Sequence, residues 1–163
     1  MDAGGQRAVS VDIRPLSTAH AGELVTVQRA AYLAEARRYA AWDLPPLVET
    51  LRQVEDHIAS GQPALGAFDG HRLVGSVRGN VDGDRMEVAR LFVAPDQQGR
   101  GIGRRLLDAA AGATPSGVDV LWLFTGARSE ENLRLYESAG FVRVGERVDG
   151  LGITLVTLER KVI

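Results

Sequence analysis

The segment Gln98-Gly99-Arg100-Gly101-Ile102-Gly103 constrains the fold of this chain more than any other part of the sequence. An apolar run over 86–93 precedes it and predicts a strand, and the run over 104–110 after it predicts a helix. A glycine-rich turn between a strand and a helix N-terminus is a ready anion site, because free backbone N–H groups and the positive end of the helix dipole converge there. Glycines also let the backbone approach a ligand closely. The segment therefore predicts a site for a phosphate or pyrophosphate.

Two common nucleotide-binding patterns do not fit this turn. The dinucleotide fingerprint needs Gly-x-Gly-x-x-Gly, and the P-loop ends in Gly-Lys-Ser/Thr, whereas Gly103 is followed by two arginines. The turn does match Gln/Arg-x-x-Gly-x-Gly/Ala, with Gln98, Gly101 and Gly103 at the defining positions.

This pattern resembles the acetyl-CoA-binding motif of the GNAT acyltransferase superfamily. A second segment, Asn132-Leu-Arg-Leu-Tyr-Glu-Ser-Ala-Gly-Phe141, is similar to the family's C-terminal motif, and one expected strand separates the two. The resemblance extends from about Val9 to the C-terminus. It implies a mixed α/β, GNAT-like fold in which the strand before the glycine-rich turn and the strand after its helix run parallel and splay apart. The pantetheine arm of the cofactor would lie between them.

Composition limits the other classes of protein. The 163 residues are 45% hydrophobic, which suits one domain with an ordinary core. The net charge of −2 gives no reason to expect a nucleic-acid partner or an anionic membrane surface, and the lack of cysteine excludes disulfides, a thiol nucleophile and a cysteine-based zinc site. No apolar run approaches the ~20 residues of a membrane span. We expect a disordered tail over 1–8, a single domain over 9–163 and a cytoplasmic protein.

Hydrophobic periodicity predicts the remaining elements. A helix follows the first strand, and a second amphipathic helix follows the Pro45-Pro46 connector, where no helix can continue. Asp-Gly turns between apolar runs then predict an antiparallel meander of three strands. The expected order is β-α-α-β-β-β-α-β-α-β-β, with strands over 9–16, 64–68, 72–81, 86–93, 118–125, 141–148 and 153–160. The expected buried positions of the first two helices are Leu24, Val27, Ala31 and Ala34, then Leu47, Leu51, Val54 and Ile58.

The resemblance also implies which residues hold acetyl-CoA, the expected cosubstrate. The N–H groups of the glycine-rich turn would cradle the pyrophosphate, with nearby arginines adding positive charge. Backbone groups near the end of the preceding strand would pair with the pantetheine amides, and one N–H there would polarise the thioester carbonyl. The residues expected to bind the cofactor are Leu91, Phe92, Val93, Gln98, Gly99, Arg100, Gly101, Ile102, Gly103, Arg104 and Asn132.

Glu87 is the carboxylate expected to act as a base, and relatives often carry a Glu near this position. It stands in an otherwise apolar strand, on the expected pleat face of Ala89 and Leu91. Because an ammonium group has a pKa near ~10, the amine must lose a proton before it attacks a thioester, and a carboxylate can assist through water. The alternatives are a solvent-facing Glu near the start of a strand and a salt-bridged one, paired with Arg85 or Arg90.

Tyr136 is the expected general acid. Asn132, Leu135, Tyr136 and Ala139 share one face of the expected last helix, so two polar groups stand in an apolar stripe. The resemblance places the tyrosine beside the sulfur, where a phenol can protonate the departing CoA thiolate. The alternative is a core tyrosine with one satisfied hydroxyl.

The acceptor side is open to two interpretations. Tyr32, Tyr39 and Trp42, with Asp43 beside them, are the expected substrate-binding residues and would hold a cationic amine. Alternatively, the aromatic residues only pack helix against helix. Arginines at 37 and 38 would instead favour an acidic acceptor.

These features together predict an N-acetyltransferase that moves an acetyl group from acetyl-CoA to the amine of a small molecule or peptide, by direct attack and without a metal. A non-catalytic acyl-CoA sensor and an enzyme that acylates protein N-termini or lysines are the alternatives. Many relatives form dimers, and the last hairpin is the candidate interface for a homodimer. The three histidines, His20, His57 and His71, are expected on the surface.

Overall fold

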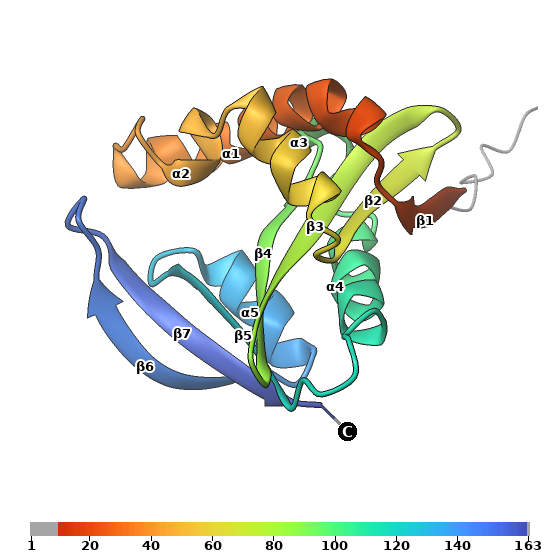
Figure 1. Cartoon of the computed structure of the whole chain (residues 1–163). Coiled ribbons are helices and arrows are strands. Elements are labelled where there is room, and N and C mark those ends of the chain that lie inside the picture. The colour runs from red at the N-terminus through yellow and green to blue at the C-terminus, as the bar shows by residue number, and fades with distance from the viewer. Residues whose placement is uncertain (1–9, 163) are drawn as a thin grey trace, which may run out of the picture.

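A computed structural model describes residues 10–162, so the tail expected over 1–8 lies outside the described residues. Seven strands form one mixed sheet in the order β1-β2-β3-β4-β5-β7-β6 (Figure 1). The strands are β1 (Val11–Pro15), β2 (Ala64–Asp69), β3 (Arg72–Asp82), β4 (Arg85–Val93), β5 (Val120–Gly126), β6 (Val142–Val148) and β7 (Thr154–Lys161). The helices are α1 (Ala21–Tyr39), α2 (Pro45–Val48), α3 (Leu51–Ala59), α4 (Ile102–Gly112) and α5 (Glu130–Ser138), with short 3₁₀ turns η1 (Thr18–His20) and η2 (Pro95–Gln97).

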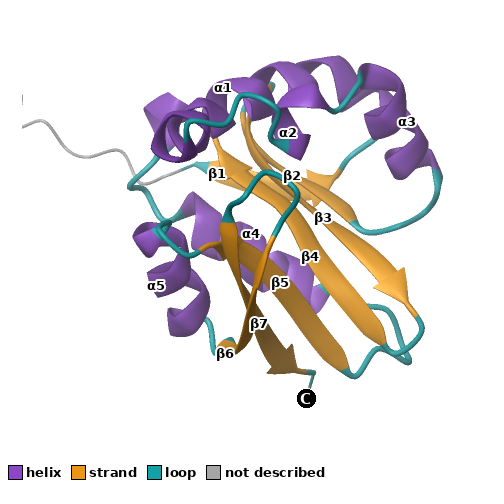
Figure 2. Ribbon diagram, turned by 90° about the vertical axis from the view of Figure 1, so that its left-hand side faces the viewer, coloured by secondary structure: helices purple, strands orange, loops and turns teal. Residues whose placement is uncertain are grey.

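Helices cover both faces of this sheet. Helices α1–α3 lie over one face, and α4 and α5 lie against the other (Figure 2). The core is accordingly divided into two clusters of buried side chains. One surrounds Leu106 and Leu107 of α4, and the other joins Leu24 of α1 to Phe92 of β4. Strands β2, β3 and β4 are successive antiparallel partners, which confirms the predicted meander.

Strands β4 and β5 run parallel and then separate. They pair only where Arg85–Glu87 lies beside Val120–Trp122, whereas β5 pairs with β7 along its whole length. Beyond Glu87 the edge of β4 is therefore free of a neighbouring strand on this side. The splayed sheet implied by the resemblance is confirmed, and the separation opens space inside the molecule.

A β-bulge shapes β4 just beyond this point. Ser76 pairs with Phe92 and Arg78 with Ala89, so β4 contains one more residue than β3 between these pairs. Arg90 occupies the bulge with a φ of 54°, in the left-handed region. The bulge reverses the alternation of side chains, since Leu91 packs into the core on the α4 side while Phe92 joins the core on the α1 side. The prediction that Glu87 and Leu91 share a pleat face is therefore wrong.

The predicted second helix is two helices. Helix α2 ends at Val48, and Glu49 takes an extended conformation with φ −59° and ψ 130°. Helix α3 then starts afresh, with the hydroxyl of Thr50 accepting a hydrogen bond from the Gln53 amide at 3.2 Å. The single amphipathic stripe expected across this segment is interrupted, and Leu51 is 47% exposed. The break turns the Glu49 side chain toward the sheet.

The buried stripe of α1 also differs from the expected one. Ala34 is exposed, and the fully buried residues include the polar Gln28. Periodicity alone favoured the apolar positions, but Gln28 is buried because its amide meets polar partners. Its Nε2 donates to the Pro46 carbonyl at 3.0 Å and to Glu49 Oε1 at 2.9 Å.

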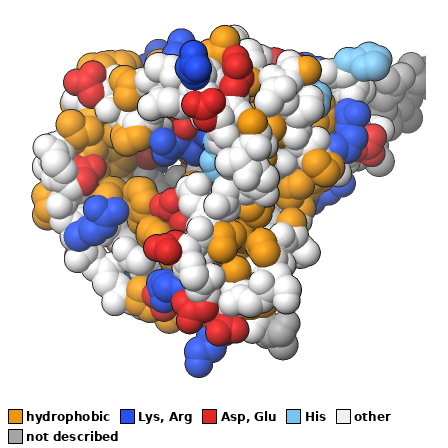
Figure 3. All heavy atoms as spheres, viewed as in Figure 1, with side chains coloured by type: hydrophobic (Ala, Val, Ile, Leu, Met, Phe, Trp, Pro, Cys, Tyr) orange, Lys and Arg blue, Asp and Glu red, His pale blue; other side chains and the backbone are white. Residues whose placement is uncertain are grey.

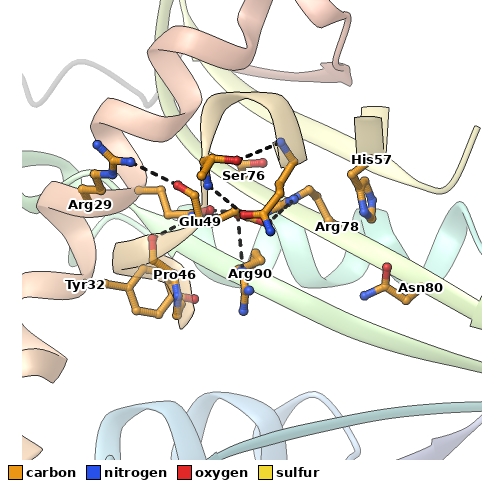
Figure 4. A network of polar contacts seen from close by, with 12 residues as sticks. Arg29, Tyr32, Pro46, Glu49, His57, Ser76, Arg78, Asn80 and Arg90 are labelled. Carbon is orange, nitrogen blue, oxygen red and sulfur yellow. Dashed lines mark hydrogen bonds and ion pairs between the residues drawn. The ribbon is translucent and has the colours of Figure 1, made fainter. Parts of the chain in front are cut away.

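These partners belong to a buried network around Arg78 of β3 (Figure 4). Arg78 is only 3% exposed, and its guanidinium donates to both carboxylate oxygens of Glu49 and to Gln28 Oε1. Burial by itself would raise the pKa of Glu49, but hydrogen bonds from Arg78 and Gln28 outweigh burial and lower it. The network ties α1 and the α2–α3 junction to the middle of the sheet.

Strand β6 is exposed along its whole length, and Val142, Val144 and Val148 are each more than half exposed. A homodimer through this hairpin stays a prediction.

We expect Glu49→Gln to lower the free energy of unfolding by about 3–5 kcal/mol, because it leaves the Arg78 charge buried without its counter-ion. Urea denaturation measures this, with the exposed Asp56→Asn on α3 as the control, expected within about 0.5 kcal/mol of wild type. Since the folded pKa of Glu49 lies below the ordinary value of a glutamate, the stabilisation is present above that ordinary value and is lost as the pH falls through the folded pKa. The variant should therefore lose stability less steeply in acid. An unchanged midpoint in urea would contradict the role of this pair.

Candidate active site

The larger of two cavities lies between helices α1–α3 and the open edge of β4. Its volume is about 460 Å³, and Figure 3 shows this face hollowed below the helices, with basic and acidic side chains at the rim. Strands β4 and β5 contribute Glu87 and Thr125, α5 contributes Asn132 and Tyr136, and the β6–β7 connection contributes Asp149.

The second cavity, of about 450 Å³, lies beside the glycine-rich turn. It runs between the end of β4 and the start of α4 and also reaches Tyr32, Asn132 and Tyr136. Because these three side chains border both cavities, the two spaces meet at the separation of β4 and β5.

The turn itself has the backbone form of an anion cradle. Gly99 and Gly101 both have φ +77°, a conformation that residues with a Cβ rarely adopt, and open space surrounds the position of a Cβ at each. Gly101 is the N-cap of α4, and its carbonyl accepts from the Arg105 amide at 3.2 Å. The N–H groups of Ile102, Gly103 and Arg104 therefore have no partner within the helix. This donor set suits a pyrophosphate.

The side chains of the turn bind mainly to the protein itself. Gln98 donates to the Val93 carbonyl at 3.3 Å, and Arg100 donates to Gln97 at 2.5 Å. Arg104 reaches Asp108 at 3.1 Å and the Ser138 carbonyl at 3.2 Å. The cradle is thus a backbone site, and the roles of Arg100 and Arg104 toward phosphates stay predictions.

The predicted pantetheine-binding stretch, 91–93, lines this second cavity. Two of its carbonyls already accept hydrogen bonds, from the Tyr32 hydroxyl at Leu91 (3.2 Å) and from Gln98 at Val93. The role predicted for this stretch therefore depends on its remaining backbone groups.

On α5, Tyr136 is 7% exposed and opens onto both cavities. Burial raises the pKa of its phenol above the ordinary value, with smaller contributions from Tyr32 and Glu35. One turn earlier, Asn132 donates to Thr125 Oγ1 at 3.3 Å. The helix therefore presents both predicted polar residues toward the space between the strands.

Glu87 lies on the wall of the larger cavity, at the last residue of β4 that pairs with β5. Its carboxylate accepts from Asn80 Nδ2 at 3.0 Å. The ion pairs proposed as alternatives do not form, because Arg85 pairs with Glu159 and Arg90 lies beside Glu49. The Glu87 carboxylate, whose side-chain partner is the neutral amide of Asn80, therefore faces the cavity.

The aromatic residues expected to bind the acceptor are separated in the structure. Tyr32 and Tyr39 line the larger cavity, but Trp42 is 60% exposed and lies outside both linings. The Tyr39 hydroxyl lies 2.7 Å from Ser129 Oγ, which donates to Glu35 at 2.7 Å. Tyr39 therefore ties α1 to the start of α5 as well as lining the cavity.

His57 corrects another expectation. It is half-buried and lines the larger cavity, with Nε2 3.4 Å from the Pro63 carbonyl. Burial, followed by the charge of Arg78, lowers the pKa of His57 below its ordinary value. The surface position predicted for it is wrong because the break before α3 turns this helix over the cavity.

One family of known proteins matches most of this chain. The family described as "Acetyltransferase (GNAT) domain" matches residues 35–162. This chain belongs to the GNAT acetyltransferase family. The match covers the glycine-rich turn, Glu87 and Tyr136, and the resemblance drawn from the two sequence motifs is confirmed.

A curated relative is N-alpha-acetyltransferase RimI of Mycobacterium tuberculosis. It is 40% identical to this chain over 87 residues, which are 51% of this chain and 54% of RimI. The chain thus spans about half the length of the curated relative that it matches.

Solved structures show the same fold over nearly the whole chain. PaiA N-acetyltransferase from Thermoplasma acidophilum, in complex with coenzyme A, has a TM-score of 0.77 at 21% identity and covers 93% of this chain and 99% of its own. YncA, a putative acetyltransferase from Salmonella typhimurium with acetyl-CoA, has a TM-score of 0.75 at 20% identity and covers 94% of this chain and 95% of its own. Acetyl-CoA is the cosubstrate of this family, and the backbone cradle fits its pyrophosphate.

Residues 10–162 contain neither a candidate metal site nor a candidate membrane span. Their histidine and carboxylate side chains nowhere gather in a group of three or more that could hold a metal ion. Nor does any helix in this range combine the length and apolar character that a membrane span requires.

Sequence reasoning missed the charged residues of the larger cavity: Glu35, Glu49, Arg78 and Arg90. Arg78 gave a signal, because an arginine interrupts an apolar strand, and so did Gln28 on the buried side of α1. Their partner Glu49 comes from a helix break that periodicity did not reveal.

We expect Gly101→Val to raise the Kd for CoA by about tenfold or more. A β-branched residue cannot hold φ +77° without strain of roughly 1–2 kcal/mol, so the turn should relax and move its N–H groups off the phosphate position. Calorimetric titration with CoA measures the effect. Gly83→Val is the matched control, since it meets similar strain at φ +62° in the β3–β4 turn and should leave the Kd unchanged. Equal affinities of wild type and Gly101→Val would contradict the cradle.

Proposed function

We propose that this protein transfers the acetyl group of acetyl-CoA to a primary amine by direct attack within the space between β4 and β5. The observation that carries the proposal is the position of Tyr136, which borders both the cavity beside the phosphate cradle and the cavity that contains Glu87. Thioester and amine can therefore meet at this tyrosine.

The acceptor arrives from the larger cavity. Glu87 takes a proton from the ammonium group, directly or through water, so that the nitrogen lone pair becomes nucleophilic. The new C–N bond forms at the thioester carbonyl, whose developing negative charge a backbone N–H of residues 91–93 would stabilise. The C–S bond then breaks, the thiolate leaves with its electron pair, and the nitrogen releases its remaining extra proton, which replaces the one that the general acid gives to the thiolate.

Tyr136 supplies the proton that this thiolate takes up. Because burial raises the pKa of Tyr136, its phenol stays protonated at neutral pH and is ready to donate. A covalent enzyme intermediate is not needed, and the chain has no cysteine to form one. Asn132, one turn before Tyr136, would contact the cofactor from α5.

The acceptor is the amine of a small molecule or a peptide. RimI bears the name N-alpha-acetyltransferase, and a solved neighbour, the ribosomal-protein-S18-alanine N-acetyltransferase of Escherichia coli, has a TM-score of 0.73 at 19% identity. A protein N-terminus is the acceptor that these names suggest. A non-catalytic acyl-CoA sensor is the second candidate, because the cradle alone would suffice for it.

We expect Tyr136→Phe to lower kcat by about 100-fold or more while the Kd for CoA stays within about threefold of wild type. Release of free CoA thiol measures turnover, and calorimetry measures binding. A sensor would bind CoA equally in both forms and release none with any amine. Since the raised pKa keeps the phenol protonated, wild-type kcat should not decline between about pH 6 and 9 through loss of this proton. Equal turnover of the variant would refute the acid role.

Glu87→Gln should lower kcat/KM by about 10- to 100-fold at neutral pH, because the amine loses its proton acceptor. The deficit should shrink as the pH approaches ~10, where free amine becomes abundant without assistance. Asp82→Asn, an exposed acid at the nearby turn, is the control and should match wild type. A deficit that is the same at every pH would assign Glu87 a structural role instead.

A further inference from the structure

The larger cavity holds two arginines that share one carboxylate. Both terminal nitrogens of Arg78 have partners, since they donate to both oxygens of the Glu49 carboxylate and to Gln28, and only its Nε is left without a hydrogen bond among the described residues. Arg90 meets the same carboxylate only through Nε, at 3.5 Å, and this buried Nε makes no hydrogen bond among the described residues. Around Glu49 there are thus two cations and one anion.

Arg90 directs its charge into the cavity. In Figure 4 its terminal nitrogens point away from Glu49 and toward α5, while the dashed contact to Glu49 runs to the other side of the guanidinium, and Arg90 lines the larger cavity. Its side chain is only 26% exposed, so water compensates the charge incompletely. A half-buried cation without a full partner is costly, and an anion bound beside it would remove that cost.

The bulge in β4 is what brings Arg90 to this position. In a regular strand residue 90 would lie on the face of Met86 and Val88, both buried in the core on the α4 side. The left-handed conformation of Arg90, with φ 54°, is strained for a residue with a Cβ and turns its side chain to the cavity instead. The chain therefore accepts strain at the position where an arginine enters the site.

The other charged groups of the cavity have partners of their own. Glu35 pairs with Arg38 at 2.8 Å, Asp149 accepts two backbone amides at 2.9 Å, and Arg147 lies over the Phe124 ring at 5.0 Å. His57, on the wall near Arg78, has a pKa lowered by burial. Arg147 is exposed to solvent, so the partly buried groups whose charge is least compensated are the Arg90 guanidinium and the carboxylate of Glu87, whose side-chain partner is a neutral amide.

This pair of opposite charges suits a zwitterion. Glu87 and Arg90 are three residues apart on β4, so their side chains leave the strand within roughly 10 Å of each other and reach into the same cavity. We infer that Arg90, held beside Glu49, binds a carboxylate of the acceptor, so that the acceptor is a free amino acid or a similar small amino carboxylate. Its ammonium group then lies toward Glu87 and Tyr136.

Charge balance favours a carboxylate over a phosphate. The excess around Glu49 is a single positive charge, which one carboxylate neutralises, whereas a phosphate monoester carries about −1.5 to −2. A guanidinium also matches a carboxylate with two parallel hydrogen bonds. The inference rests on the proposed acetyl transfer and adds the class of acceptor to it.

The test compares free amino acids with their C-terminal amides, which keep the amine and lose the negative charge. With acetyl-CoA, we expect wild type to acetylate at least one free amino acid with a kcat/KM about 10- to 100-fold above that of its amide. Arg90→Gln should abolish most of this preference, chiefly through KM, and leave the amide unaffected. Arg90→Lys should recover part of it, and Arg52→Gln, an exposed arginine on α3, should keep it in full.

A binding measurement separates this inference from the proposed function. N-acetylated amino acids, which are the products, should bind the CoA complex in calorimetry more tightly than their amides, and Arg90→Gln should remove the difference. Faster turnover of amides, polyamines or peptide N-termini would overturn the carboxylate site while leaving acetyl transfer intact. So would a preference unchanged in Arg90→Gln, or no free amino acid that is acetylated or binds as its product. Failure of wild type to bind CoA at all would instead overturn the proposed function.

Discussion

The separation of β4 from β5 after Glu87 is the constraint on which the rest of the structure depends. Three residue pairs hold the strands together, and beyond them the backbone of β4 has no strand on that side. A sheet edge inside a protein needs partners for its N–H and C=O groups, and here an extended cofactor arm can supply them. The separation also joins the two cavities, so that Tyr32, Asn132 and Tyr136 border both of them.

The bulge at Arg90 adds a second function to this strand. By reversing the side-chain alternation it places Leu91 in one core and Phe92 in the other, and it turns an arginine toward the acceptor. The buried Arg78–Glu49 pair then fixes the helices above the cavity relative to the strand below. Stability and specificity are therefore coupled, because the carboxylate that neutralises Arg78 also positions Arg90.

Local sequence predicted what depends on local physics. Gly99 and Gly101 adopt positive φ angles, which glycine does without strain because it has no Cβ. The α5 face that carries Asn132 and Tyr136 follows from helical spacing alone. The prediction was wrong where distant partners decide the outcome. A continuous helix over 47–58 satisfied the apolar pattern, yet the chain leaves the helix at Glu49 because its carboxylate meets Arg78 from β3. Gln28 is buried for the same reason.

The sequence by itself determined the family, the order of strands along the chain and the glycine-rich turn before α4, and it named the candidate phosphate cradle and the two candidate proton-transfer residues, because each rests on neighbours within a few positions of the chain. Only the tertiary structure decided that Trp42 lies outside the cavities, that His57 lies on a cavity wall and that Arg90 lines the larger cavity. These outcomes depend on one extra residue in β4 and on an ion pair between segments 29 positions apart. Neither the extra residue nor the ion pair is visible in the hydrophobic periodicity of the sequence. A charge can be buried only where the fold brings its partner close.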